Sequence, residues 1–317
     1  MITEGEFGDE PFGLLELGSN SLKFYVVGSL KSSSPSIMTC KFPWRVAHDF
    51  FLNGVLSRST VAELIDTVGG VKEHSAGIPL QSMLAVATGV FREVPHAADI
   101  ASRIHEAMGV RVRIISGSEE AKLMARAFNR QSAAEAPTVL VDLGGATLEW
   151  AYLDDCSYQS LGSLPLGAIR NGYLFEKYLS DPADYLKESS AYCDEVLAEL
   201  PICGPVQAVA TGGTAKAMAR CYGHDIVPLD QIRKLVETVS REGPPKFLKP
   251  TRRQVLLPGL VILWRMLVRC KSEALVYGKV SVGDGMAARL VRLLGSYRRS
   301  ELHATLLLHS SQVGFES

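Results

Sequence analysis

Residues 12–28, FGLLELGSNSLKFYVVG, combine groups that could hold an anion and a metal ion. The stretch is typical of an apolar strand that ends in an acid, Glu16, followed by a polar turn and a second strand. A plain hairpin turn needs only a glycine or two. This turn adds backbone that can approach a ligand closely and three small polar side chains, in Gly18, Ser19, Asn20 and Ser21. Its composition suits a turn that binds phosphate together with a divalent cation.

The same pattern returns in residues 139–153, VLVDLGGATLEWAYL. At a constant offset of 126 residues and without a gap, Glu16 falls on Asp142 and Lys23 on Glu149. The second turn supplies Gly144, Gly145 and Thr147. Two such units at the heads of two half-chains predict a duplicated α/β architecture. Chance similarity between two hairpins is the alternative.

Two more loops have the composition of anion sites. In ATGGTAKAMAR, the residues Gly212, Gly213 and Thr214 precede a predicted helix, whose unpaired N–H groups would face a phosphate. In IISGSEEAKL, Glu119 and Glu120 follow Ser116 at the junction of a strand and a helix. Acids at this position either cap the helix or take part in catalysis. All four loops follow strands, and together they predict a phosphate-binding cleft.

The remaining elements alternate between strands and helices, which predicts a mixed or parallel sheet covered on both faces. The polar, proline-bearing stretch at residues 129–138 marks a boundary or hinge. We therefore expect an N-terminal lobe at 1–128 and a C-terminal lobe at 129–317. Whether the last helix packs back on the first lobe stays open.

Composition argues against several classes of function. The chain has 33 basic and 34 acidic residues, so no global field favours DNA or a membrane surface. Six scattered cysteines lack metal-ligand spacing and are typical of reduced thiols. The longest apolar run, residues 255–268, contains Pro258 and Arg265 and is shorter than the roughly 20 residues that cross a bilayer. We expect a soluble cytoplasmic protein without DNA or membrane partners. Its oligomeric state is open, a homodimer included.

The motifs ELGSNS, ATGVFREV, ISGSEEAKL, VDLGGATLE, SLPLGAIR and ATGGTAKAMA, in this order, resemble those of the exopolyphosphatase/guanosine pentaphosphate phosphatase family. The resemblance covers nearly the whole chain and matches the short, two-domain form. It implies membership of the actin-like ATPase and sugar kinase superfamily. The expected fold is therefore α/β, with two ribonuclease-H-like lobes of the actin and sugar kinase type and a cleft between them.

The resemblance also implies roles for individual residues. Glu120 matches the base that activates the attacking water. Asp142 matches an acid that holds Mg²⁺ or another divalent cation, and Glu16 is expected to approach the same ion. Arg92 and Glu149 match residues that line the site. The expected phosphate contacts come from three loops: Gly18, Ser19, Asn20 and Ser21; Gly144, Gly145 and Thr147; and Gly212, Gly213 and Thr214.

The sequence departs from the family pattern at several positions, and three of them bear most on the expected site. Glu16 stands where the family usually has aspartate, and the extra methylene moves the carboxylate by roughly 1.5 Å. Ala146 replaces a glycine. Gly283 stands where the family has an arginine, which removes a positive charge. These changes predict a site of altered geometry that keeps Glu120 and Asp142.

Three functions are compatible with this pattern. The leading hypothesis is a Mg²⁺-dependent hydrolase that releases terminal phosphate from polyphosphate, or the 5′-phosphate from guanosine pentaphosphate. The basic stretch at 244–254 either tracks such a polyanion or is a solvated face. The alternative is a catalytically weakened member that binds guanosine tetra- or pentaphosphate, or another nucleotide, as a sensor. The third is a small-molecule kinase with a nucleotide at residues 212–214 and a separate acceptor pocket.

Overall fold

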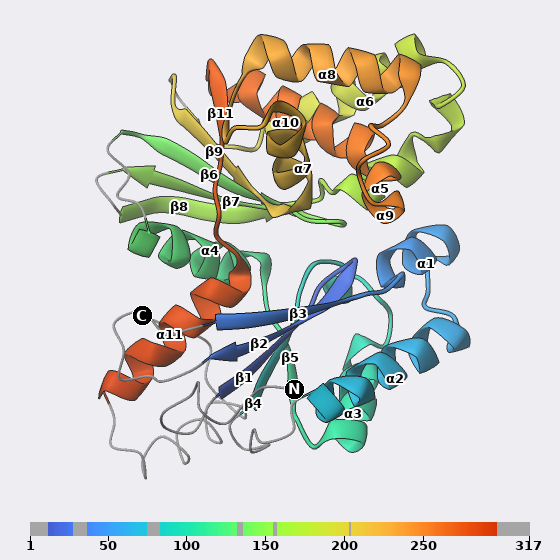
Figure 1. The fold of residues 1–317 in the computed structure, drawn as a ribbon, viewed down its shortest axis with the longest axis vertical. Helices are drawn as coiled ribbons and strands as arrows, with labels where there is room; N and C mark the ends of the chain where they lie inside the picture. Colours follow the sequence, from blue (N-terminus) through green and yellow to red (C-terminus); the bar gives the residue numbers. More distant parts are fainter. Residues whose placement is uncertain are drawn as a thin grey trace. The chain divides into compact units, whose positions relative to one another are not determined.

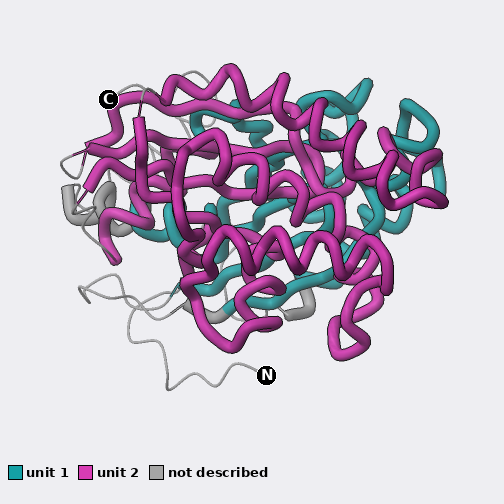
Figure 2. Tube along the Cα trace, turned by 90° about the horizontal axis from the view of Figure 1, so that it is seen from above, with its two compact units in different colours: residues 1–119, 282–317 teal, residues 120–281 magenta. Residues whose placement is uncertain are grey.

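The computed structural model describes residues 12–27, 37–74, 83–131, 136–154, 157–202 and 204–296 of the 317-residue chain. The chain forms two compact units, one of residues 1–119 with 282–317 and one of residues 120–281 (Figure 2). The chain passes from the first unit to the second between Glu119 and Glu120, inside one helix. The sequence places this boundary after residue 128. Residues 132–135 of the expected hinge lie outside the described residues.

The first unit is built on a mixed sheet with the strand order β3-β2-β1-β4-β5 (Figure 1). Its strands are β1 (Phe12–Leu17), β2 (Ser21–Val27), β3 (Ile37–Pro43), β4 (Met83–Ala87) and β5 (Val112–Ile114). The hairpin of β1 and β2 is antiparallel, whereas β4 runs parallel to β1. The central strand β1 is buried along nearly its whole length, as expected for a strand covered on both faces.

Helices in the described part of this unit connect and cover the strands. They are α1 (Val46–Asn53), α2 (Arg58–His74), the 3₁₀ helix η2 (Gly89–Arg92), α3 (Ala97–Met108) and α11 (Val282–Ser296). Helix α11 contacts β1, although more than 260 residues separate them in the chain. Helix α4 (Gly117–Gln131) begins in this unit and continues in the second.

The second unit repeats the topology of the first. Its sheet has the order β10-β11-β9-β6-β7-β8, in which β6, β7, β8, β9 and β11 correspond to β1 to β5. The strands are β6 (Thr138–Leu143), β7 (Leu148–Asp154), β8 (Ser157–Leu164), β9 (Gln207–Thr211), β10 (Ile226–Pro228) and β11 (Ala274–Tyr277). The shared order agrees with the duplication that the two loop sequences predict.

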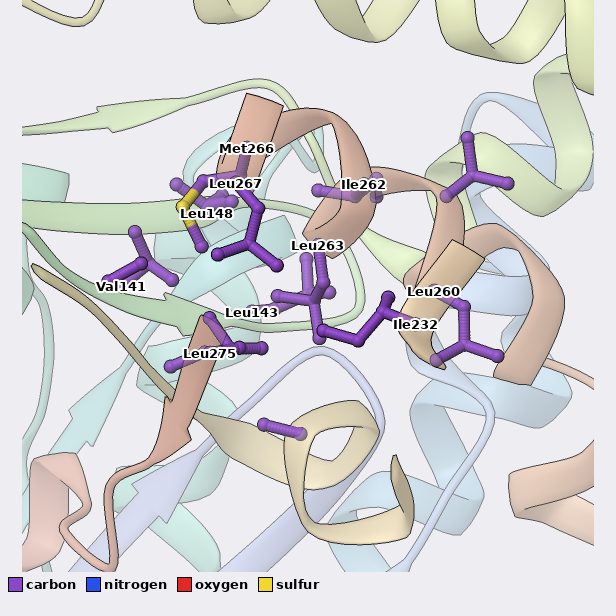
Figure 3. Packing of buried hydrophobic residues seen from close by; sticks show 14 of the residues in the cluster. Val141, Leu143, Leu148, Ile232, Leu260, Ile262, Leu263, Met266, Leu267 and Leu275 are labelled. Atoms are coloured by element: carbon purple, nitrogen blue, oxygen red, sulfur yellow. The ribbon is translucent and has the colours of Figure 1, made fainter. Parts of the chain in front are cut away.

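Helices cover both faces of the second sheet. The remaining helices of the described chain are α5 (Ala168–Leu174), η3 (Glu176–Tyr178), α6 (Pro182–Leu197), α7 (Gly212–Tyr222), α8 (Leu229–Glu242), α9 (Pro250–Arg253) and α10 (Leu256–Cys270). Apolar side chains of α10 pack against β6 and β7 (Figure 3), with Leu263 and Met266 among them and Leu143 and Leu148 opposite. Helix α4 covers the other face through Met124 and Phe128.

No helix in the described ranges combines the length and the apolar composition that a membrane span requires.

Candidate active site

The turn between β1 and β2 is held in place by three other segments of the first unit. The indole Nε1 of Trp44 donates to the carbonyl of Gly18 (2.8 Å), and the N–H of Ala47 donates to the carbonyl of Ser19 (3.0 Å). The Ser19 hydroxyl accepts from the N–H of Val90 (3.0 Å), at the start of η2. These bonds fix the backbone of the turn in one conformation. Because the Ser19 oxygen accepts the bond from Val90, its hydroxyl proton can be donated to a ligand.

Glu16, the acid before this turn, has donors on both carboxylate oxygens. Lys23 Nζ lies 2.6 Å from Oε1, and Tyr25 Oη donates to Oε2 at 2.7 Å. Glu16 is almost fully buried, so this pairing compensates the charge that burial removes from water. Asn20 and Ser21 complete the turn, in which the N–H of Gly18 donates to the carbonyl of Ser21 (3.0 Å).

Arg92 ends η2 in the first unit. Its Nη1 lies 3.4 Å from the carbonyl oxygen of Ile115, the residue after β5. The side chain is partly buried rather than extended into solvent. This contact fixes the guanidinium near the ends of β4 and β5, the sheet edge where the first turn also lies.

The two adjacent acids of α4 have different environments. Glu119 Oε2 accepts from the N–H of Ser116 (2.9 Å), and the Ser116 hydroxyl accepts from the N–H of Glu119 (3.1 Å), which together form a capping box. Arg113 also pairs with Glu119. Glu120 instead lies on the buried face of the helix, with 6% of its surface exposed. Helix capping therefore explains why an acid is present at position 119. It does not explain why the Glu120 side chain is buried.

The turn between β6 and β7 is the counterpart of the first turn. The N–H of Gly144 donates to the carbonyl of Thr147 (3.0 Å), and the carbonyl of Gly145 accepts from Ile169 (2.8 Å) and Arg170 (3.0 Å) of α5. Helix α5 comes so close that a Cβ on Gly167 would lie 2.3 Å from the Gly145 carbonyl oxygen. Because the carbonyl groups face α5, the backbone N–H groups of Gly145 and Ala146 are left for another acceptor.

Asp142 and Glu149 are direct cross-strand partners in β6 and β7. They occupy the register positions that Glu16 and Lys23 occupy in the first hairpin. The first hairpin therefore carries an acid opposite a base, whereas the second carries two acids side by side. Glu149 is 1% exposed and its Oε1 accepts from the Ser163 hydroxyl (2.8 Å). Two neighbouring carboxylates repel each other unless a proton or a cation is shared between them.

Glu120 belongs to the same layer of the second unit as this acidic pair. Leu140 and Ala151, two residues from Asp142 and Glu149 along their strands, pack on the side chains of α4. Because side chains alternate along a strand, both acids point to the α4 face. Helix α4 ends shortly before β6 begins, so its N-terminal Glu120 lies toward the strand end that carries Asp142.

Helix α7 begins directly beside Asp142. A Cβ on Gly212, where φ is +93°, would lie 2.8 Å from Asp142 Oδ1, so the two residues are in close contact. No side chain caps this helix. The guanidinium of Arg252 lies against the next residue, since a Cβ on Gly213 would be 2.0 Å from Nη2. Thr214 is buried, and its hydroxyl has no partner within the described chain. A positive helix end and an arginine thus lie next to an acidic pair.

The donor chemistry of the second unit fits a divalent cation. Mg²⁺ usually takes one or two carboxylates and completes its shell with water and phosphate oxygens. Asp142 with Glu149 meets this requirement. The described residues contain no group of three or more His, Cys, Asp or Glu that would form an all-protein cage. Glu16 fits direct coordination less well, because Lys23 already neutralises its charge.

Two of these contacts could not be predicted from the sequence. Arg252 belongs to the basic stretch at 244–254, but its position at Gly213 depends on the packing of α9 beside α7. Tyr25 lies in an ordinary apolar strand pattern. Lys23 could have been noticed, because the alignment of the two hairpins places it at the position that Glu149 occupies in the second one.

Comparison with known proteins gives consistent results. The chain is 28% identical to Exopolyphosphatase 1 of Mycobacterium tuberculosis over 326 residues, which covers 95% of this chain and 92% of that protein. For Exopolyphosphatase 1 of Mycobacterium leprae, the identity is 28% over 67% of this chain and 64% of the relative. Guanosine-5'-triphosphate,3'-diphosphate pyrophosphatase of Aeromonas salmonicida is 25% identical over 65% of this chain and 42% of its own length.

Solved structures resemble this fold. A Ppx/GppA family member from Aquifex aeolicus superposes with a TM-score of 0.74 at 19% identity, covering 91% of this chain and 99% of that one. The expected α/β fold of two actin-like lobes is confirmed. The model of the Ppx/GppA phosphatase family matches residues 26–293. The chain therefore belongs to the Ppx/GppA phosphatase family.

Proposed function

We propose that this protein is a Mg²⁺-dependent phosphoanhydride hydrolase that releases terminal phosphate from inorganic polyphosphate. The observation that carries the proposal is the acidic pair Asp142–Glu149 beside the start of α7 and Arg252. A cation site and an anion site next to each other suit a metal-bound phosphate chain. The mycobacterial relatives are named exopolyphosphatases, which supports the choice of substrate class.

In the proposed reaction, Glu120 accepts a proton from the attacking water as its oxygen bonds to the terminal phosphorus. The bond from that phosphorus to the bridging oxygen breaks, and orthophosphate and a shortened chain are the products. A bound divalent cation would neutralise charge on the phosphate oxygens, held by Asp142 with support from Glu149. Arg92 and the N–H groups of the three loops would stabilise the phosphoryl oxygens. These loops contain Gly18, Ser19, Asn20 and Ser21; Gly144, Gly145 and Thr147; and Gly212, Gly213 and Thr214.

A basic strip in the second unit supports polyphosphate over guanosine pentaphosphate. Residues 212–224 and 244–254 contain six lysines and arginines and no acid, in a chain whose net charge is −1. The six are Lys216, Arg220, Lys246, Lys249, Arg252 and Arg253. None of them takes part in an ion pair within the described ranges. Unpaired like charges repel one another, so a polyanion would stabilise them.

The strip begins at the candidate site and continues along α7. Arg252 lies on Gly213, and Lys216 and Arg220 follow at one-turn intervals on the exposed face of the helix. Arg220 lies over the ring of Phe247, which is 56% exposed in the neighbouring segment. A phosphate chain whose end lies at Gly213 could extend along this face.

The decisive experiment measures phosphate release by the purified full chain with Mg²⁺, offering polyphosphate and guanosine pentaphosphate in parallel. Glu120→Gln removes the proposed base. Glu119→Gln is the matched control, since it makes the same chemical change at the neighbouring position, whose contacts are a helix cap and an ion pair with Arg113. We expect release from polyphosphate that falls at least about a hundredfold in Glu120→Gln, the usual contribution of a general base. Glu119→Gln is expected to keep activity.

Other outcomes would assign a different function. Release from guanosine pentaphosphate alone would move the substrate to the class named for the Aeromonas relative. Binding of guanosine tetraphosphate without release from either substrate would identify a sensor. Transfer of phosphate from ATP to an acceptor would identify a kinase.

A further inference from the structure

Glu16 is held by two donors that both come from β2. Lys23 is its direct cross-strand partner, and Tyr25 lies two residues further along the same strand, on the same face. Their bonds to Oε1 and Oε2 measure 2.6 and 2.7 Å. The carboxylate lies beneath the first turn, where a Cβ on Gly18 would be 3.7 Å from Oε1. The two donors together set both the position and the rotation of the carboxylate.

The ring of Tyr25 occupies the space beside Gly283, the second residue of α11. A Cβ on Gly283 would lie 2.1 Å from the ring atom Cζ and 2.4 Å from Cε1 and Cε2. Gly283 is buried and its φ is not positive, so the backbone itself does not require glycine. The requirement comes from the ring, because any larger side chain would displace it and its hydroxyl.

We propose that Tyr25 is a positioning residue for Glu16, and that glycine at 283 is the condition for this role. The inference rests on the proposed function. From the sequence, the absence of an arginine at 283 looks like the loss of a phosphate contact. In the structure, the glycine at 283 leaves room for the ring of Tyr25, whose hydroxyl donates to Glu16. The substitutions at 16 and 283 are parts of one rearranged contact with Tyr25.

The arrangement defines what Glu16 can do chemically. Lys23 neutralises the carboxylate, which disfavours direct contact with a divalent cation. Each oxygen keeps a lone pair that can accept a further hydrogen bond. Mg²⁺ retains several waters when it binds. Glu16 would therefore accept a hydrogen bond from a water of a bound cation's hydration shell, and Tyr25 fixes the direction of the carboxylate.

Tyr25→Phe tests the proposal, because it keeps the ring against Gly283 and removes only the hydroxyl. Mn²⁺ affinity is measured by electron paramagnetic resonance titration with imidodiphosphate, a pyrophosphate analogue with a P–N–P bridge, and the melting temperature is recorded in parallel. We expect affinity to weaken by about three- to tenfold, the effect of one charge-assisted hydrogen bond. Tyr222→Phe is the control. It also removes a hydroxyl, bonded to the Gln231 carbonyl at 2.6 Å, and should leave Mn²⁺ affinity unchanged.

Gly283→Ala supplies the second arm. Alone, it should weaken Mn²⁺ affinity by a similar factor, because it displaces the ring. Added to Tyr25→Phe, it should cause no further loss of affinity, even where the melting temperature falls, because the hydroxyl is already absent. Gly69→Ala, where nothing lies within 4 Å, controls for adding a methyl group to a helix.

Three results would overturn the proposal: unchanged Mn²⁺ affinity in Tyr25→Phe, additive losses in the double variant, or no Mn²⁺ binding by the unmodified protein. None of these readings depends on turnover. Phosphate release from polyphosphate judges the proposed function separately, so the two can fail independently.

Discussion

The guanidinium of Arg252 lies directly against the backbone of Gly213, at the first turn of α7. Burial lowers the pKa of Arg252, although the arginine stays protonated at any physiological pH. The acids Asp142 and Glu149 lie beside this cation and the positive helix end, so the charges at the start of α7 are of both signs. The proposed phosphate site makes Arg252 the residue to test first.

Replacing Arg252 should weaken substrate binding. We expect Arg252→Gln to raise KM for polyphosphate by about tenfold or more, and Arg252→Lys to recover part of this loss, because a lysine keeps the charge without the bidentate geometry. Steady-state kinetics of phosphate release measure the effect. Arg233→Gln, on the exposed face of α8, is the matched control. An unchanged KM in Arg252→Gln would remove this residue from the site.

The basic strip should be specific for long chains. The double variant Lys216→Gln with Arg220→Gln is expected to raise KM for long polyphosphate several-fold and to reduce its dependence on salt, because two fewer cations face the polyanion. KM for tripolyphosphate, which is too short to follow α7, should change little. Arg233→Gln with Lys234→Gln makes the same change of charge on α8. Equal effects on both chain lengths would contradict the assignment.

The capping box of α4 predicts a stability effect that is separate from catalysis. Ser116→Ala removes the acceptor for the N–H of Glu119, and N-cap losses of this kind lower the free energy of unfolding by about 1 kcal/mol. Urea denaturation measures the change. Ser118→Ala, at an exposed position two residues later, should have a smaller effect. If both variants were equally stable, the capping bonds would contribute nothing measurable.

His48 in α1 predicts a pH dependence of stability. Burial lowers its pKa below the usual value, and the nearby charge of Arg45 lowers it further. The folded state then binds fewer protons than the unfolded state below about pH 6.5, so the free energy of unfolding falls as pH falls through this range. His48→Gln should remove this part of the loss. Urea titrations at pH 7.5 and 5.0 compare the two proteins, and an identical pH dependence in both would contradict the effect.

Local sequence patterns predicted the elements that position the site, because strand and turn chemistry act over short distances. The two acid-bearing hairpins follow directly from their residues, and a helix is expected just after the glycines at 212 and 213, which the structure includes in its first turn. The same patterns left Glu119 and Glu120 equivalent, since both can follow a capping serine. The bonds of Glu119 to Ser116 and Arg113, and the burial of Glu120, distinguish the two in the structure.

Contacts between distant segments could not be predicted in this way. Arg252 reaches Gly213 through the packing of α9 beside α7, and Tyr25 meets Gly283 through the packing of α11 on β1. Neither pair carries a local signal, because charge runs and apolar strands are common for other reasons. The division between the two units also lacks a local signal, since it falls inside one continuous helix where the composition does not change.

The contact between Tyr25 and Gly283 also constrains how this sequence could have evolved. A side chain at 283 would collide with the ring of Tyr25 in its present position, so a change at either residue alters what the other can be. Among related chains, aromatic residues at the first position should therefore occur only with glycine at the second, and the pair should be inherited as a unit.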